Sequence, residues 1–513
     1  METVEFYGGV DEIGGNKIKV NADSTSLMLD FGMSFSKNGM YFDNFVNPRK
    51  SNGIGDYIEL GLIPKIKGIY REDYIRHMGL NFEEKPSIDG LLLSHAHADH
   101  ADYMTLLRND IPFYMSQNSK VILEVLDTTG TKELYRYKEQ FKFVPKKRGE
   151  GFKQAIGDEI SSPRDIRVLK PYERETIGNL EVQLAPVDHS LPGASAFLIE
   201  GSQEKIVYTG DLRFHGRNRD ATFEFVEKAK KFQPNIMICE GTRTNSGLHK
   251  KSHDENGEEI KYLELEEEIE DKAYDLINQN NGLVVVNFPL RDLDRLVTFY
   301  NLAKNTDRKL AISLKQAYML KRIEEENSAK TIYPSIHDEA ISIYIPRRGS
   351  GLYMKDNYVN YGGHWQAADE TDRIKDYSKD KWILDFLEYD NAITYKDIQE
   401  NESDYIFRCD NFSFVDLIDV KPENAIYIHS TTEPFNEEME MSYEITENWL
   451  NHFEIPIYNH FHVSGHARGD ELLEMIREIQ PDVLYPVHTE HAEMYDILKE
   501  DGIEVIRPSL KGC

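Results

Sequence analysis

Short apolar runs alternate with segments of helical periodicity along this chain, and the alternation predicts an α/β fold. Residues 90–93, 283–288 and 425–428 predict buried strands, because each is a nearly continuous apolar stretch. Residues 290–303 and 471–478 carry apolar side chains at helical spacing and predict helices. The sequence shows no internal repeat and no low-complexity tract, so we expect a folded protein of irregular sequence.

Two segments depart from this alternation. Residues 254–271 contain ten acidic residues against the single basic Lys261. Apolar residues recur along this segment at helical spacing, which predicts a solvated amphipathic helix; they are Tyr262, Leu265, Ile269, Ala273 and Leu276. Residues 145–163 combine Lys, Arg, Gly and Pro without an apolar period, so we expect an exposed loop there.

The loop after the strand at 90–93 concentrates metal-binding side chains. Its sequence, His95-Ala-His97-Ala-Asp99-His100, places three imidazoles and one carboxylate in a single short segment. Neutral imidazoles and carboxylates suit Zn²⁺, and a pair of ions needs about seven or eight protein ligands, so this loop cannot complete a site alone. The alternative is a polar surface loop whose histidines only form hydrogen bonds, and the spacing disfavours it.

Three later segments offer the remaining ligands. His189, Asp211 and His488 each follow a short β-branched or aromatic run, as a ligand at the end of a strand would. Taken singly, a histidine in such a position is as often structural as functional. The ordered set of segments, rather than any one of them, therefore predicts a dinuclear metal site.

Composition is that of a folded protein of two or three domains. The chain has 513 residues, of which 40% are hydrophobic, and this is enough for sizeable cores. It has no apolar run of about 18 residues and no charged-then-apolar leader, so we expect neither a membrane span nor a secretory signal. Three cysteines, Cys239, Cys409 and Cys513, share no metal or redox spacing, which predicts a cytoplasmic location.

The net charge sets a constraint on partners. With 90 acidic and 60 basic residues, the formal charge is −30, whereas a protein that binds a polyanion should offer a positive footprint. Basic residues cluster after the candidate metal segments and would focus a positive field into a cleft; the alternative is that they are surface or ion-paired arginines. These residues are Arg213, Arg217, Arg219, Arg243, Arg291, Arg295, Arg347 and Arg348.

The ordered segments resemble the motifs of the metallo-β-lactamase superfamily, namely an early Asp, an HxHxDH loop, a His, a bridging Asp and a last His. Here the early Asp would be Asp30. Within that superfamily, Glu240 in Cys-Glu-Gly-Thr, His466 in Ser-Gly-His-Ala and His488 resemble motifs A, B and C of the β-CASP nucleases. The glycine-rich opening at residues 8–16 is similar to the start of RNase J-like members.

The resemblance implies a four-layer αββα sandwich with an inserted α/β β-CASP domain. The metallo-β-lactamase domain would comprise residues 1–244 and a return segment at 461–513, and the insertion would comprise residues 245–460. The chain departs from the RNase J pattern where Ala101-Asp102-Tyr103 replaces the usual glycines, and the sequence after His488 is closer to archaeal-type relatives. Residues 354–410 are interpreted as an elaboration of a subfamily.

The resemblance also implies a metal assignment. Two Zn²⁺ per chain would share Asp211, and Mn²⁺ could use the same ligands. Asp30 would orient ligand imidazoles from behind. One ion would bind His95, His97 and His189, and the other would bind Asp99, His100 and His488.

The implied chemistry is metal-assisted hydrolysis of a phosphodiester. The catalytic residues would be Asp99, Asp211, Glu240 and His466, with His466 as general acid and Glu240 holding its imidazole. Ser464, Gly465 and His466 would hold a substrate phosphate; alternatively, Ser-Gly is only a tight turn that presents His466.

The expected substrate is single-stranded RNA, cut as a 5′ to 3′ exonuclease with endonuclease action left open. Two alternatives stay open: a DNA nuclease of the same fold, and a noncatalytic RNA-binding partner of an active paralogue. The sequence ends 25 residues after His488, where bacterial RNase J has a further domain, so homo-oligomerisation is also open.

Overall fold

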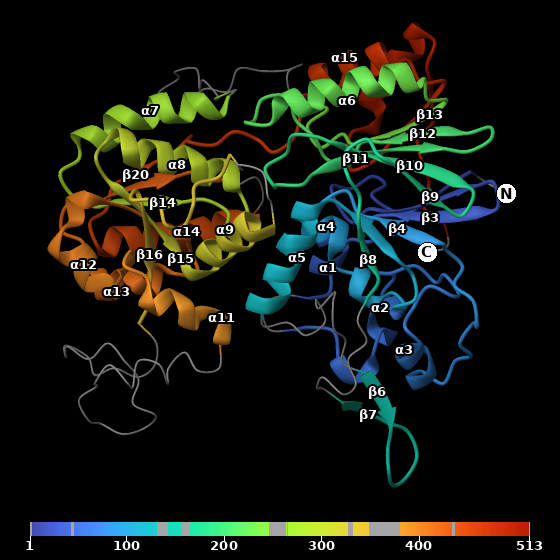
Figure 1. The fold of residues 1–513 in the computed structure, drawn as a ribbon, viewed down its shortest axis with the longest axis horizontal. Helices are drawn as coiled ribbons and strands as arrows, with labels where there is room; N and C mark the ends of the chain where they lie inside the picture. The colour runs from blue at the N-terminus through green and yellow to red at the C-terminus, as the bar shows by residue number, and fades with distance from the viewer. Residues whose placement is uncertain are drawn as a thin grey trace. The chain divides into compact units, whose positions relative to one another are not determined.

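Two stretches of the chain that lie far apart in sequence build the first structural unit. It comprises Met1–Ser252 and Gly465–Cys513, and the second unit comprises His253–Ser464 (Figure 1). The computed structural model describes residues 3–42, 46–130, 142–155, 164–245, 263, 265–326, 332–347, 380–432 and 437–511. The sequence expectation placed the insertion at residues 245–460, whereas the structural division falls after Ser252 and after Ser464.

Two mixed β-sheets form the centre of the first unit. The first sheet has the order β1-β2-β3-β4-β5-β8, antiparallel from β1 to β3 and parallel from β3 to β8. Its strands are β1 (Val4–Gly8), β2 (Lys17–Ala22), β3 (Thr25–Leu29), β4 (Gly90–Leu92), β5 (Phe113–Met115) and β8 (Ile166–Val168).

The second sheet of this unit has the order β22-β21-β13-β12-β11-β10-β9. The strands from β22 to β12 are parallel, and those from β12 to β9 are antiparallel. Its strands are β9 (Arg174–Ile177), β10 (Leu180–Pro186), β11 (Ser195–Glu200), β12 (Lys205–Tyr208), β13 (Ile236–Cys239), β21 (Val483–Pro486) and β22 (Glu504–Val505).

One apolar core lies between the two sheets, because residues such as Leu27 and Leu29 of β3 cluster with Val182 of β10 and Phe197 of β11. A second core lies on the other face of the second sheet, where helices cover it. These are α6 (Arg219–Phe232), α15 (Gly469–Ile479) and the 3₁₀ segment η8 (Ala492–Asp501). In α15 the apolar positions Leu472, Leu473, Met475, Ile476 and Ile479 are buried, which is why this helix packs on the sheet.

Helices also lie on the first-sheet side, which completes four layers (Figure 1). They are α1 (Phe35–Gly39), α2 (Gly55–Glu59), α3 (Glu72–His77), α4 (Ala98–Ala101) and α5 (Gln117–Thr129), with the 3₁₀ turns η1 (Lys50–Asn52) and η2 (Met104–Leu106). In α5, the Ser116 hydroxyl caps the first turn by accepting from the Ser119 N–H at 3.1 Å. The predicted αββα sandwich is therefore confirmed.

The second unit is built on a seven-stranded parallel sheet of order β17-β16-β15-β18-β14-β19-β20. Its strands are β14 (Val284–Asn287), β15 (Lys309–Ser313), β16 (Ile341–Tyr344), β17 (Ala392–Ile393), β18 (Tyr405–Arg408), β19 (Ile426–His429) and β20 (Ile457–Tyr458). Strands such as β19 are buried along their whole length, as expected when helices lie on both faces.

Crossover helices connect these parallel strands. They are α8 (Leu293–Asn305), α9 (Leu314–Glu326), α11 (Lys381–Leu384), α12 (Tyr395–Glu400), α13 (Leu417–Val420) and α14 (Glu437–His452), with the 3₁₀ turns η5 (Asp385–Glu388), η6 (Glu402–Asp404) and η7 (Phe414–Asp416). Helix α7 (Glu266–Gln279) comes before β14, the first strand of this sheet in sequence order. The strands predicted at 90–93, 283–288 and 425–428 and the helices predicted at 290–303 and 471–478 are confirmed as β4, β14, β19, α8 and α15, with ends shifted by a few residues. Much of the predicted elaboration at 354–410 lies outside the described residues.

Two sequence expectations about exposed segments are wrong in part. Residues 152–155 were expected in a loop, but β6 (Lys142–Pro145) and β7 (Phe152–Ala155) pair as an antiparallel hairpin. The acidic helix begins at Glu266, and this side chain is fully buried rather than solvated, because it forms an ion pair with Arg295. Residues 156–163 and most of 254–264 lie outside the described residues.

Each helix that the structure describes is too short or too polar to cross a membrane.

Candidate metal centre

Several candidate residues lie at the carboxyl ends of neighbouring parallel strands in the first unit. Asp30 follows β3 and the His95 loop follows β4, and these two strands are parallel neighbours. In the second sheet, Asp211, Glu240 and His488 come after β12, β13 and β21, which are also parallel neighbours. Because the carboxyl ends of parallel strands meet at the same edge, residues separated by hundreds of positions converge there.

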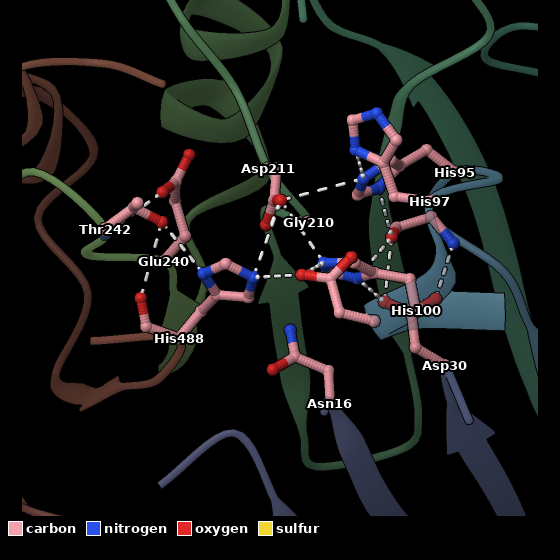
Figure 2. Close-up of polar contacts among 12 residues, drawn as sticks. Asn16, Asp30, His95, His97, His100, Gly210, Asp211, Glu240, Thr242 and His488 are labelled. Carbon is pink, nitrogen blue, oxygen red and sulfur yellow. Dashed lines mark hydrogen bonds and ion pairs between the residues drawn. The ribbon is translucent and has the colours of Figure 1, made fainter. Parts of the chain in front are cut away.

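The structure brings the seven predicted ligands together in two overlapping groups. Figure 2 labels five of them, namely His95, His97, His100, Asp211 and His488. Within each group the ligand atoms lie within 4.8 Å of one another, and Asp211 belongs to both groups. The first group is His95, His97, His189 and Asp211; the second is Asp99, His100, Asp211 and His488. A shared carboxylate between two sets of nitrogen and oxygen donors is the arrangement that a pair of divalent cations requires.

Buried polar atoms at the centre point to a cation. The Asp211 Oδ1 atom has no hydrogen-bond partner among the described residues, and the His100 and Asp211 side chains are at most 1% exposed. His100 Nε2 lies 3.2 Å from Asp211 Oδ2. Buried polar atoms are seldom left unpaired, and a metal ion that binds both residues would satisfy them.

A buried carboxylate fixes the orientation of His100. The Nδ1 atom of His100 lies 2.7 Å from Asp30 Oδ2, which leaves Nε2 directed toward Asp211. Asp30 also accepts hydrogen bonds from the N–H and hydroxyl groups of Ser94, both at 2.7 Å, and from the Tyr208 hydroxyl at 2.6 Å. Asp30 is fully buried, so all of its bonds are within the protein. Ser94 and Tyr208 were not identified from the sequence.

Two more imidazoles are oriented by groups behind them. His488 Nδ1 lies 2.8 Å from the Thr242 hydroxyl oxygen, and His189 Nδ1 bonds the carbonyl oxygen of Gly465. At Gly465 a Cβ atom would lie 3.1 Å from His189 Cε1, so the close approach depends on glycine. Thr242 was also missed from the sequence, although it lies two residues after Glu240.

The glycine-rich N-terminal turn packs against the same centre. Gly14 has a φ of +85°, and a Cβ atom there would lie 2.7 Å from Asp99 Oδ2. The Gly9 carbonyl accepts from the His488 N–H at 2.8 Å, and the Asn16 N–H donates to the Asp99 carbonyl at 3.1 Å. The turn at residues 8–16 is therefore a wall of the metal centre as well as a connection between β1 and β2.

Charge at the centre is arranged around the buried carboxylates. Burial and the charge on neighbouring His100 lower the pKa of His95 well below its usual value. For His100 burial also favours the neutral form, but the carboxylates of Asp211 and Asp99 outweigh burial and raise the pKa well above its usual value. For Asp211 burial favours the protonated form, but His100 and His488 outweigh it and hold the pKa well below its usual range. The carboxylates are therefore ionised, and a bound cation would replace the proton on His100.

A second interacting pair lies beside Asp211. His466 Nδ1 is 3.0 Å from Glu240 Oε2 and 3.9 Å from Asp211 Oδ2, and Glu240 is buried. Burial disfavours the imidazolium, but the Glu240 carboxylate outweighs it and raises the pKa of His466 to about 9. Glu240 is itself held by the Leu212 N–H at 2.8 Å. The pair thus presents a charged, oriented imidazole with a side chain that is 20% exposed.

The expectation that clustered arginines line a cleft is wrong for two of them. Arg213 is fully buried, with Nε 3.3 Å from Asp188 Oδ2, and Arg295 is fully buried against Glu266. Arg347 is also ion-paired, to Asp419 at 2.8 Å, while Arg348 lies outside the described residues. The Arg213 and Arg295 guanidinium groups form ion pairs inside the fold, so they cannot reach a substrate phosphate.

Two family models match this chain. A model described as "Beta-lactamase superfamily domain" matches residues 75–244, and one described as "Zn-dependent metallo-hydrolase RNA specificity domain" matches residues 457–508. The two matched segments contain every predicted metal ligand together with Glu240 and His466. With the donor set described above, the matches identify the centre as a divalent-metal site.

Named relatives share low sequence identity with this chain. Ribonuclease J of Helicobacter pylori (strain ATCC 700392 / 26695) is 22% identical over 493 residues, covering 94% of this chain and 55% of the relative. Probable RNase MJ4 of Methanocaldococcus jannaschii is 25% identical over 274 residues, covering 52% of this chain and 51% of the relative. The chain thus spans about half the length of these relatives.

A solved structure shares the fold over nearly the whole chain. It is the crystal structure of a protein of unknown function from Enterococcus faecalis V583, with a TM-score of 0.68 and 22% identity, covering 99% of this chain and 97% of that one. At this identity the solved structure shows a shared fold alone, while the family models and the relatives support a metallo-β-lactamase protein of the RNase J-like β-CASP type.

Proposed function

We propose that this protein is a two-zinc phosphodiesterase that hydrolyses single-stranded RNA, acting as a 5′ to 3′ exonuclease. The observation that carries the proposal is the pair of ligand groups sharing Asp211, with the Glu240–His466 pair directly beside that carboxylate. The RNA substrate is supported by the ribonuclease relatives and by the family model of an RNA specificity domain over residues 457–508.

The ligand groups suggest which residues would hold each ion. His95, His97 and His189 would bind one Zn²⁺, while Asp99, His100 and His488 would bind the other, with Asp211 between them. When bound, two such ions lower the pKa of water toward about 7, supply a nucleophile at neutral pH, and stabilise charge on the scissile phosphate. Mn²⁺ would be held by the same donors.

His466 would then act as the general acid for the leaving oxygen. Its Nδ1 atom is engaged by Glu240, so Nε2 is the ring nitrogen that would give its proton to the departing 3′ oxygen. Glu240 keeps the imidazole charged and oriented, and the partial exposure of His466 gives a substrate access to it. A positioned acid of this kind contributes about 10² to 10⁴ in rate.

The proposed phosphate pocket at Ser464 and Gly465 is supported by the place of these residues in the sequence, just before His466. Both residues directly precede His466, and Gly465 packs closely against His189. A phosphate held there by a hydroxyl and backbone N–H groups would place a 5′ end near the acid. The cytoplasmic location and any homo-oligomer stay predictions.

The test is digestion of RNA labelled at either end, bearing a 5′ monophosphate or a 5′ hydroxyl, with metal content measured on the same preparation. The wild type should release mononucleotides from the monophosphorylated 5′ end and should leave the matched DNA strand largely intact. His466→Ala should lose about 10²- to 10⁴-fold in rate with its metal content unchanged. The matched control is His491→Ala, because this histidine has a side chain that is 42% exposed, pairs with Glu493 and belongs to neither ligand group.

Each part of the proposal has its own contrary result. Internal fragments alone would exclude the 5′ exonuclease mode, and equal cleavage of DNA would exclude the RNA preference. Fully metallated wild type that hydrolyses neither strand would overturn the nuclease assignment in favour of a binding role. An unimpaired His466→Ala variant would remove that residue from the mechanism.

A further inference from the structure

The tip of the β6–β7 hairpin is a basic surface on a strongly acidic chain. Lys146, Lys147, Arg148 and Lys153 are exposed around the turn, against the single acidic Glu150. No ion pair joins any of these four cations to a carboxylate of the described residues. The chain as a whole carries a formal charge of −30, whereas the net charge of the hairpin tip is positive.

Several other basic residues of the first unit lie beside acidic groups. Arg213 is buried against Asp188, and the exposed Lys228 and Lys231 of α6 lie 3.8 and 4.0 Å from Glu224 and Glu227. The hairpin differs because four exposed cations, none of them in an ion pair with a described residue, gather around one turn. An uncompensated basic cluster is the electrostatic footprint expected of a contact with a polyanion.

The base of the hairpin is fixed on α3. The ring of Phe143 in β6 stacks on His77 with centroids 4.0 Å apart and an interplanar angle of 7°, and it meets the ring of Tyr74 at 5.7 Å. The Phe143 N–H also donates to Asp73 Oδ2 at 2.9 Å. Gly149 and Gly151 adopt positive φ angles of 79° and 91°, which allows the tight turn at the tip. The basic side chains are therefore carried on an anchored ribbon.

The same helix connects the hairpin to the layer that holds the metal loop. The Arg71 N–H, at the start of α3, donates to the Leu106 carbonyl of η2 at 3.1 Å. Tyr70 and Leu107 form an isolated antiparallel β-bridge next to it. The turn η2 follows directly on α4, which carries Asp99 and His100. In Figure 1 the hairpin extends from the edge of the first unit beside α3.

We propose that the hairpin tip binds the phosphate backbone of single-stranded RNA at nucleotides beyond those held at the metal centre. This inference rests on the proposed function for its ligand, and it adds a second, sequence-independent contact to that function. Lys146, Lys147 and Arg148 would release counterions from the strand on binding, which gives affinity that falls with salt. We expect the affinity to rise with RNA length, because the strand must reach both the metal centre and the hairpin tip.

The test measures RNA affinity apart from catalysis. The variant Lys146→Gln/Lys147→Gln/Arg148→Gln is compared with wild type by fluorescence anisotropy, using a 30-nucleotide RNA in EDTA over a range of salt concentrations. For single strands each phosphate contact contributes about −0.7 to the slope of log K against log salt, so three lost contacts should reduce the slope by about 2 and the affinity by roughly 10- to 100-fold at 0.1 M salt. The matched control, Lys228→Gln/Lys230→Gln/Lys231→Gln on α6, removes the same charge from the same unit and should leave affinity and slope nearly unchanged.

Hydrolysis of bis(p-nitrophenyl) phosphate by the metal-loaded proteins reports the centre itself and should be equal in all three. RNA affinity and slope equal to wild type in the hairpin variant would overturn the hairpin proposal, whether or not the wild type digests RNA. Loss of affinity in the α6 control to the same extent would also overturn it, since the effect would then be one of net charge. If the wild type binds RNA through the hairpin but does not hydrolyse it, the proposed function fails and the hairpin contact stands.

Discussion

Asp30 gives the sharpest test of how the metal centre is assembled, because one buried carboxylate receives four hydrogen bonds. The donors are two groups of Ser94, the Tyr208 hydroxyl and His100 Nδ1, at 2.6 to 2.7 Å. Asp30 has a φ of 56°, a conformation that asparagine tolerates well. Asp30→Asn therefore changes the charge and one acceptor atom while keeping the backbone.

The size of the effect follows from the acceptor atoms and the charge of Asp30. Oδ1 accepts from the Ser94 N–H, whereas Oδ2 accepts from the Ser94 hydroxyl, the Tyr208 hydroxyl and His100 Nδ1. An asparagine oxygen at the Oδ2 position keeps the last three bonds, but its NH₂ group faces the Ser94 N–H and the negative charge behind His100 is lost. Losing the charged partner behind a metal-bound imidazole costs about 10- to 100-fold in metal affinity, or roughly 1.4 to 2.8 kcal/mol. Tyr208→Phe removes a single donor to Asp30 and should cost less, about threefold to tenfold.

The assay is competition for Zn²⁺ against a chromogenic chelator, with metal stoichiometry measured after equilibration. We expect affinity to fall in the order wild type, Tyr208→Phe, Asp30→Asn. Asp89→Asn, which changes an exposed carboxylate in the same unit, serves as the control and should match wild type. If Asp30→Asn retains the wild-type affinity, Asp30 does not act through His100 and the reasoning is refuted.

Two further predictions concern stability in the second unit. Glu266→Gln leaves the buried Arg295 guanidinium without its carboxylate, and it should lower the free energy of unfolding, measured in urea, by about 3 to 5 kcal/mol. The double variant Glu266→Leu/Arg295→Met removes both charges and should lose less of this free energy. Equal losses in the two variants would contradict a charge effect. Burial together with Asp419 and Asp410 raises the pKa of Asp416 from 3.8 to about 7, so the folded state favours the neutral acid and the free energy of unfolding falls as pH rises from about 4 to 7. Asp416→Asn should therefore stabilise the protein by up to roughly 4 kcal/mol at pH 8 and by less at pH 6. A gain that does not change with pH would show that ionisation of Asp416 is not the cause.

The metal loop could be located from the sequence because its signal is local. The donors from His95 to His100 follow an apolar run that forms β4, and both features lie within one short window. His189, Asp211 and His488 could be placed at strand ends for the same reason. Their convergence at one edge was an inference from the order of the segments, and its geometry came from the pairing of parallel strands.

The partners behind the ligands could not be predicted, because they are distant in sequence and chemically ordinary. Tyr208 meets Asp30 across 178 positions, and Thr242 meets His488 across 246. A tyrosine at the end of a strand or a threonine in a turn has no pattern that marks such a role. The prediction that clustered arginines line a cleft failed for a related reason. A sequence shows which residues are charged but not which are buried, and Arg213 and Arg295 are inside the fold.

Residue patterns alone indicated strands such as residues 90–93, helices such as residues 471–478 and the side chains that offer metal-binding donors, since these depend on neighbouring residues and on side-chain chemistry. They did not indicate the β6–β7 hairpin. Tertiary structure alone decided which polar groups face the centre, which charges are neutralised in the interior and which stay in solvent. The acidic helix shows the difference: Glu266 belongs to a solvated pattern by sequence, yet it pairs with Arg295 in the core. The basic hairpin shows the opposite case, where Phe143 anchors a ribbon on His77 and leaves Lys146 exposed. The physical reason is that burial and pairing are set by the packing of elements remote in sequence, where desolvation and charge–charge contact outweigh local preference.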